Sequence, residues 1–413
     1  MKKTFILTII AVLCFSSCEN LIPDEDPVPR KEIELTKSQM EFVQTNNGFA
    51  LDLFRQVAKE GEGKNLLISP LSVTIDFGMV NNGAVGKTQQ EIYETLGYKE
   101  DSVEGLNTFC QMMMEQSATL DPSVTLEIAN AAVVNKMYPG LKDSFTRTVK
   151  SFYDAEVIYK DFGKEDIKGL VNDWCDRKTH GMIPELLTRP VEKSEYAHFL
   201  NAVYFKGQWT SKFKKSDTKK DTFTLEDGTK TSVKMMHQKD QFNYGSIPGL
   251  CTALSLPYGN QAYCMTLLLP DKGKTLAGFI DEFDVSAWNQ LWMSAAEVDV
   301  KIPSFETEYF VSLKDILPGM GIRLAFGDGA DFSAMSSTPD LFIADVLHKA
   351  RIKVDEEGSE AAAVTDITIG FAMADPVTAP VPSFEFRAEW PFIYVITEIS
   401  TGAIYFIGQY TGK

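Results

Sequence analysis

Residue types that commonly carry out catalysis or bind metals are sparse in this chain, and their spacing fits neither role. The four histidines have no paired spacing: His180, His198, His237 and His348. No metal-ligand spacing, and none that selects a disulfide pair, links Cys110, Cys175, Cys251 and Cys264. There is no Gly-x-Ser-x-Gly turn and no His-Glu-x-x-His motif, and the run 81–88 is one glycine short of a phosphate-binding loop. The sequence therefore predicts no enzyme, no metal site and no cofactor.

One stretch near the C-terminus, from Val354 to Phe386, differs in composition from the remainder of the chain. It opens with carboxylates at 355–357 and with Gly358, and no Lys or Arg occurs between Val354 and Glu385 although the chain has 40 of them. Read at the strand period of two, one face is uncharged throughout: Ser359, Ala361, Ala363, Thr365, Ile367, Ile369 and Phe371. The glycine and the later prolines are instead typical of an exposed loop. The stretch is thus either a loop able to become a strand, or an ordinary strand followed by a linker.

The elements that must position this stretch predict an α+β fold, because helices come mainly first and strands mainly later. Expected helices are 42–59, 72–82, 88–96, 138–152, 167–179, 279–293 and 311–317. Expected strands are 66–69, 124–134, 198–205, several within 223–270, 297–305, 341–354 and much of 392–407. The formal charge of −17 argues against nucleic acid as a partner. The local basic run Lys214, Lys215, Lys219 and Lys220 is interpreted as a solvated loop.

The residues 354–363 resemble the hinge of the reactive-centre loop in the serpin family. That motif is a glutamate, a second polar residue, a glycine, Thr or Ser, any residue, and then small residues. Other family motifs are matched in order, from about Ser38 to Gly412: 47–50, 65–72, 82–88, 201–209, 331–333 and 348–350. The resemblance implies one serpin domain, residues 38–413, with about nine helices around three antiparallel or mixed β-sheets. It also implies a long exposed reactive-centre loop at about 356–385.

For function, the resemblance implies an inhibitor of serine proteases that is not itself an enzyme. The protease attacks the loop and forms an acyl-enzyme, and the loop then inserts into the main sheet before the enzyme deacylates. The hinge on this reading is Glu356, Glu357, Gly358, Ser359, Ala361, Ala362 and Ala363. The uncharged face and the absence of proline before Pro376 favour insertion. The alternative is a non-inhibitory binding protein with the serpin fold.

Counting the usual loop length from Glu356 places the attacked peptide bond between Ala372 and Met373. An alanine there suits an elastase-like serine protease, while Phe371 or Met373 suits a chymotrypsin-like enzyme in a neighbouring register. Cysteine proteases are a further target class, and the lack of Lys and Arg argues against trypsin-like targets. The partner is therefore expected to be a protease held as a covalent acyl-enzyme by a monomeric inhibitor.

The resemblance also assigns a cluster of polar residues beneath the centre of the main sheet. This "shutter" consists of Ser69, Ser72, Asn201 and His348, which would hold two central strands together. Two departures from the family are visible. Ser304 stands where many serpins have a lysine that pairs with the residue matched by Glu356, and Trp390 replaces a more usual histidine.

The N-terminus reads as a bacterial lipoprotein signal peptide, residues 1–17, followed by the lipidated Cys18. The acidic, proline-rich segment 18–37 is expected to be an extended tether. These features predict a protein on the cell envelope, anchored through the Cys18 lipid at the outer membrane or cell surface. Simple secretion is the alternative.

Overall fold

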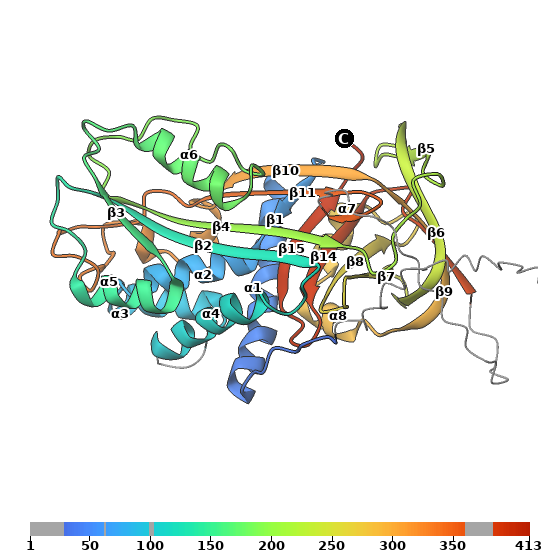
Figure 1. Ribbon diagram of the computed structural model, residues 1–413, viewed down its shortest axis with the longest axis horizontal. Helices are drawn as coiled ribbons and strands as arrows, with labels where there is room; N and C mark the ends of the chain where they lie inside the picture. The colour runs from blue at the N-terminus through green and yellow to red at the C-terminus, as the bar shows by residue number, and fades with distance from the viewer. Residues whose placement is uncertain (1–28, 62, 99–102, 360–382) are drawn as a thin grey trace, which may run out of the picture.

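The computed structural model describes residues 29–61, 63–98, 103–359 and 383–413. Helices and strands pack as layers, with the long strands of one sheet running between two groups of helices (Figure 1). The helices before residue 160 are α1 Lys37–Glu60, α2 Pro70–Asn81, α3 Gly86–Leu96, α4 Val103–Ser117 and α5 Asp143–Tyr153. The later helices are α6 Ile167–Lys178, α7 Leu276–Glu282, α8 Val285–Gln290 and α9 Ile316–Met320.

Local sequence explains where the two central helices begin. Thr36 caps α1 in a capping box with Gln39, in which each side chain accepts a hydrogen bond from the other residue's backbone N–H. Ser69 caps α2 through its side chain, and Pro70 occupies the first turn, where its missing N–H costs nothing. Because α2 is buried almost throughout, polar residues that follow Ser69 in this helix, such as Ser72, are buried too.

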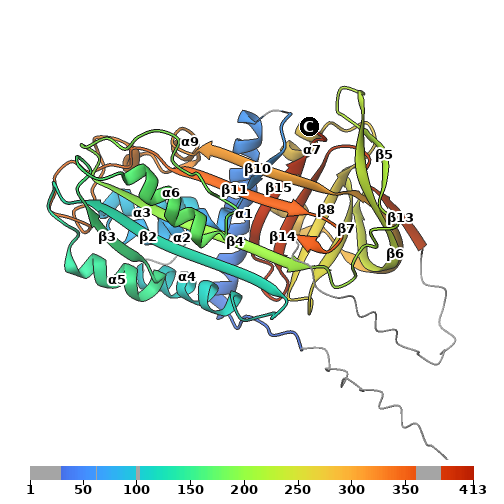
Figure 2. The same cartoon turned by 45° about the horizontal axis from the view of Figure 1, so that its top comes forward.

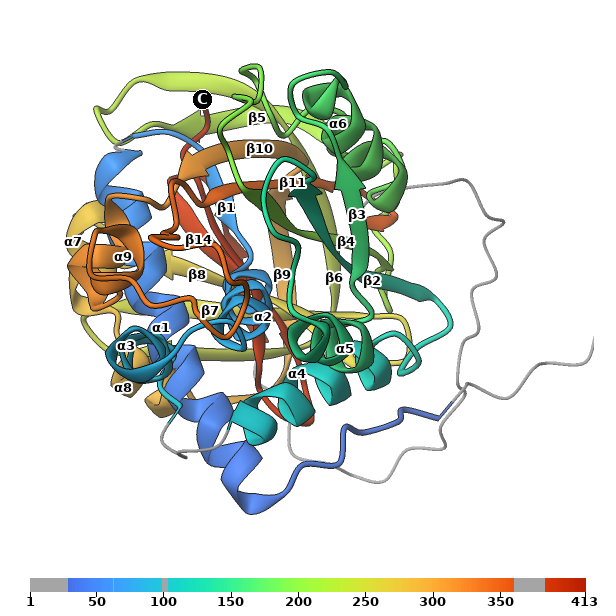
Figure 3. The ribbon, with the colours of Figure 1, turned by 90° about the vertical axis from the view of Figure 1, so that its left-hand side faces the viewer.

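The sheet that carries the candidate site has six strands in the order β10-β11-β12-β4-β2-β3. Their bounds are β10 Phe305–Ser312, β11 Leu347–Val354, β12 Gly358–Ser359, β4 Ala197–Gln208, β2 Val124–Asn135 and β3 Glu156–Lys160. Helix α6 lies on one face of this sheet, and α2, α4 and α5 lie on the other (Figures 2 and 3). The face toward α2 joins the main hydrophobic core, while a smaller cluster that includes Trp174 and Leu200 fills the space under α6.

The second assembly has nine strands, in the order β1-β15-β14-β8-β7-β6-β9-β13, with β5 on β6. The bounds are β1 Leu66–Ile68, β5 Lys219–Thr224, β6 Lys230–Ile247, β7 Cys251–Tyr258, β8 Tyr263–Pro270, β9 Met293–Pro303, β13 Ser383–Arg387, β14 Phe392–Glu398 and β15 Ile404–Tyr410. Strand β6 pairs with β5 at its beginning and with β7 at its end. It thereby joins two sheets into one, and with the six-stranded sheet these make the three sheets expected of the fold.

Among the local expectations that the structure contradicts, two concern strands β10 and β11. The range 311–317 was expected to be helical, but Val311 and Ser312 end strand β10, where they pair with His348 and Leu347 of β11. The range 341–354 was expected to be one strand, but β11 begins only at Leu347. Pairing partners decide both cases, and a short apolar run does not reveal them. The single α+β domain itself is confirmed.

Candidate functional site: the hinge and the sheet beneath it

The hinge is already part of the six-stranded sheet. Gly358 and Ser359 form β12, where they pair with Gln208 and Gly207 of β4, and Ser359 also pairs with Val354 of β11. At residue 358 a Cβ atom would lie 2.0 Å from the Gly207 carbonyl oxygen, so only glycine fits there. The loop was expected to be exposed, but at these two residues it is buried within the sheet. These two residues therefore form a short strand of this sheet in the intact chain.

Ser359 is held by its side chain as well as by its backbone. It is 1% exposed, and its hydroxyl lies 2.7 Å from the Tyr258 hydroxyl, within hydrogen-bond distance. Tyr258 in turn stacks on Trp209, with ring centroids 4.5 Å apart. The Ser359 hydroxyl thus gives the buried Tyr258 hydroxyl a hydrogen-bond partner. The sequence motif did not predict this contact with Tyr258.

The residues before Gly358 are fixed by the chain segment after β4. The Trp209 backbone N–H donates to the Glu357 carbonyl at 2.9 Å, and its indole N–H donates to the Asp355 carbonyl at 2.9 Å. The Phe213 N–H donates to the Glu356 carbonyl at 3.0 Å. Trp209 therefore clamps the turn that leads into the hinge.

An ion-pair cluster stabilises the same turn. The Glu357 carboxylate lies 3.2 Å from the Lys212 amine and 3.2 Å from the Lys215 amine. Burial alone would raise the pKa of Glu357, but the two lysines outweigh it and hold the pKa below its usual range. Ser304 has no amine to form the ion pair that many serpins make with the residue matched by Glu356, whereas Lys212 and Lys215 pair with the neighbouring Glu357. Lys215, interpreted from sequence as part of a solvated loop, is in fact a hinge contact.

The four shutter residues come together beneath β4 and β11. The backbone N–H of Ser69 donates to His348 Nε2 at 3.0 Å, and the Ser72 hydroxyl donates to Asn201 Oδ1. Burial lowers the pKa of His348 to about 4, so its ring is neutral and can accept this hydrogen bond. Asn201 continues the network by donating to Asn130 of β2 at 2.7 Å. Sequence analysis missed Asn130, which the pairing of β2 with β4 places directly opposite Asn201.

Below the hinge, the sheet is not closed. Among the strands that the structure describes, β4 and β11 do not pair with each other, and β12 alone stands between them. Since β12 has two residues and β4 has twelve, no described strand lies beside most of the inner edge of β4. The arrangement offers an antiparallel position that another strand could occupy.

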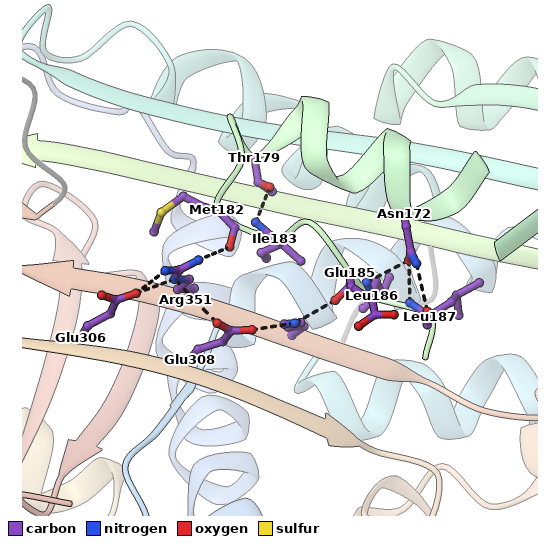
Figure 4. A network of polar contacts seen from close by, with 11 residues as sticks. Asn172, Thr179, Met182, Ile183, Glu185, Leu186, Leu187, Glu306, Glu308 and Arg351 are labelled. Carbon is purple, nitrogen blue, oxygen red and sulfur yellow. Dashed lines mark hydrogen bonds and ion pairs between the residues drawn. The ribbon is translucent and has the colours of Figure 1, made fainter. Parts of the chain in front are cut away.

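A segment after α6 crosses the outer face of β11 (Figure 4). Lys349 Nζ donates to the Glu185 carbonyl at 2.8 Å, and Arg351 donates to the Met182 carbonyl at 3.3 Å. Asn172 of α6 holds the end of the segment through the amides and carbonyl of residues 186–187. The same segment also buries Ile183, Leu186 and Leu187 in the smaller hydrophobic cluster, so apolar packing and polar contacts together hold it on the sheet.

Several predicted site residues lie outside the described residues: Cys18, Ala361, Ala362, Ala363, Ala372 and Met373. Within the described part of the chain no cluster of His, Cys, Asp or Glu could hold a metal ion. The cysteines in that part are free and buried, and burial raises the pKa of the Cys110, Cys175 and Cys251 thiols to about 12. None of the helices described there is both long and apolar enough to cross a membrane.

Comparison with known proteins identifies the family of the chain. The family model for Serpin (serine protease inhibitor) matches residues 44–412. The chain belongs to the serpin family. A leukocyte elastase inhibitor from Sus scrofa is 34% identical over 377 residues, covering 88% of this chain and 97% of that protein. Iripin-8 from Ixodes ricinus is 33% identical over 384 residues, covering 91% of this serpin and 94% of the tick protein.

Two solved structures illustrate the range of the fold. The thermophilic serpin tengpin in its native state superposes with a TM-score of 0.80 at 26% identity, covering 94% of this chain and 98% of tengpin. Human thyroxine-binding globulin with its bound hormone superposes with a TM-score of 0.79 at 27% identity, covering 90% of this chain and 98% of the globulin. Inhibitor and hormone-carrier names thus both occur among its relatives.

Proposed function

We propose that this serpin inhibits elastase-like serine proteases by trapping the acyl-enzyme while its loop inserts between β4 and β11. The observation that carries the proposal is the pairing of Gly358 and Ser359 with β4, and of Ser359 also with β11. These two residues start the inserted strand in a defined register. The chain that follows them needs no new nucleation, because each further residue adds to an existing ladder.

Continuing this register residue by residue tests the loop sequence against its destination. Ala361 would lie between Phe205 and Ile352, both of which are buried in the core. Thr365 would lie between Asn201 and His348, where its hydroxyl meets the shutter network. On the inward face, Ala361 would therefore meet apolar neighbours, and the Thr365 hydroxyl would meet the polar side chains of Asn201 and His348.

The outward face fits equally well. In the same register Glu360 would lie between Lys206 and Lys353, the two lysines flanking that level of the sheet. The charge that could not be buried is thus placed outward, beside two cations. Both faces of the loop thus match the open position between β4 and β11. A loop that inserts requires this match, whereas a loop that never enters the sheet does not.

The preference for elastase-like proteases rests on Ala372 and on the names of relatives. A shallow primary pocket accepts a methyl group, and one methylene is worth only about 1–3 kcal/mol in such a pocket. The serpin of Sus scrofa that matches this chain is named for leukocyte elastase. The expected products with pancreatic elastase are a covalent complex that survives SDS and a C-terminal fragment that begins at Met373.

A non-inhibitory binding protein is the second candidate, favoured by the likeness to thyroxine-binding globulin. Elastase separates the two functions. An inhibitor forms the covalent complex, whereas a binding protein is cleaved without retaining the enzyme or is not attacked at all.

For location, we propose attachment to the bacterial envelope through a lipid on Cys18, with residues 18–37 as the tether. The basic n-region, the apolar run 4–13 and the small residues before Cys18 support this. Metabolic labelling with a palmitate analogue tests it: wild type should be labelled, and Cys18→Ala should not.

A further inference from the structure

A cavity of about 460 Å³ lies at the end of the open position that is remote from the hinge. Its walls come from the beginning of β4, the segment before β11, α2 and the chain after α6. Most of the lining is apolar, including Phe77, Leu186, Phe199, Met335 and Leu341. A cavity of this size holds a small organic molecule and is large enough to bury most of its surface.

One carboxylate in the wall of the cavity has an oxygen atom without a hydrogen-bond donor from the described part of the chain. Asp76 of α2 is one of the lining residues, and its Oδ1 atom is buried without a hydrogen-bond partner among the described residues. Burial raises the pKa of Asp76 to about 7, since the ionised carboxyl has no cation beside it. An unsatisfied buried carboxylate is costly, and a ligand that donates to it recovers that cost.

The charged groups around the cavity are mostly acidic. The other charged or titratable residues of the lining are Glu195 and His198 at the start of β4, Arg189 before it, and Asp340 and Asp345 before β11. Arg189 lies 2.7 Å from Glu195, and His198 lies 3.2 Å from the same carboxylate, so both basic groups are already engaged. The unneutralised charge at this site is therefore negative.

The cavity coincides with the last part of the loop's destination. If the pairing of β12 with β4 and with β11 were continued along the chain, residues 366–371 would lie opposite 195–200 on one side and 342–347 on the other. These two ranges are the cavity's long walls. A molecule in the cavity and the end of the inserted loop cannot be present together.

We propose that this cavity is a binding site for a small amphipathic amine, with its apolar body between Phe199 and Met335 and its ammonium group on Asp76. Occupancy stops the loop before residues 366–371 have inserted and so turns the inhibitor into a substrate. The second statement rests on the proposed inhibitory function, while the first does not.

Calorimetry at pH 8, where Asp76 is ionised, tests the site with 2-phenylethylamine as probe. The neutral 2-phenylethanol has a body of the same shape and no charge. We expect one amine per chain, binding at least about tenfold more tightly than the alcohol. Asp76→Asn should abolish that preference, while Asp173→Asn, at an exposed carboxylate of α6, should keep it. Below pH 7 the preference should shrink as Asp76 becomes protonated.

Equal binding of amine and alcohol to the wild-type protein overturns the site, and that comparison needs no variant to fold. The functional consequence is read from the moles of serpin consumed per mole of elastase, with and without saturating amine. A rise of severalfold supports the competition, and an unchanged ratio at saturation overturns it. If the serpin does not trap elastase even without amine, the proposed inhibition fails, and calorimetry alone decides the site.

Discussion

The position between β4 and β11 has two ends, and their polar groups differ in how many have hydrogen-bond or ion-pair partners. At the hinge end, Ser359 is buried and bonded to Tyr258, Trp209 holds two carbonyls, and Glu357 has two lysine partners. At the remote end, a cavity replaces the strand, and Asp76 has a buried oxygen without a partner. The contrast indicates a sheet that is closed where insertion starts and unfinished where it ends. Completing the strand is the source of the free energy that the proposed mechanism uses.

The largest expected effect comes from placing a charge on the inward face near the hinge. In the inserted state Ala361→Asp would put a carboxylate between Phe205 and Ile352, at a cost of several kcal/mol. Its neighbour gives the matched control, because Ala362→Asp would point outward beside Arg351. We expect Ala361→Asp to be cleaved by elastase as a substrate, and Ala362→Asp to remain an inhibitor. Equal stoichiometry of inhibition for the two variants would contradict the register.

Cleavage in the loop should have the next largest effect, on stability. Inserting the cleaved loop would remove Ile367, Ile369 and Phe371 from water and fill the remote cavity. Each such side chain contributes about 1.5–3 kcal/mol, so the unfolding temperature should rise by about 10 °C or more. Calorimetry of a preparation with one verified cut between residues 370 and 375 measures this rise. If the melting curve does not move, the open end does not accept the loop.

The shutter lies midway between the two ends and should show a moderate effect of pH. Folding depresses the pKa of His348 from 6.5 to about 4, so the unfolded chain binds the extra proton first as pH falls. This contribution to stability is complete above pH 6.5 and is lost between about pH 6.5 and 4, up to about 3 kcal/mol. Denaturant unfolding across that range, compared with His348→Gln, isolates it. A variant that keeps the full wild-type loss over this range would assign the loss to other groups.

The smallest expected effect concerns the ion pairs at the hinge. Lys212 is partly exposed and Lys215 is exposed, so removing both charges should weaken the closed hinge by about 1 kcal/mol or less. The double variant Lys212→Gln/Lys215→Gln should remain an inhibitor, with an association rate altered no more than severalfold. Glu357→Gln should give the same change, and combining all three should add little. Additive effects in this cycle would show that the groups act independently.

The sequence predicted the fold class from the order of its helices and strands, and the resemblance to the family assigned the hinge and the four shutter residues from local motifs. It did not predict the partners of the hinge. Tyr258, Lys212 and Lys215 contact the hinge only because β4 and β7 place them there, and no local pattern marks such pairing. Asp76 was missed for a related reason, since a lone acid in an apolar helix gains meaning only from the cavity beside it. Strand β10 was likewise misjudged because its pairing partner, β11, lies about forty residues later.

The most direct test of the proposed mechanism is mass spectrometry of this serpin after brief incubation with pancreatic elastase. Inhibition by loop insertion predicts an intact covalent adduct of serpin and protease, together with a released fragment that begins at Met373. A fragment that begins one residue away shifts the register without changing the mechanism. Complete cleavage with free, active elastase and no adduct would contradict insertion as the function of this loop.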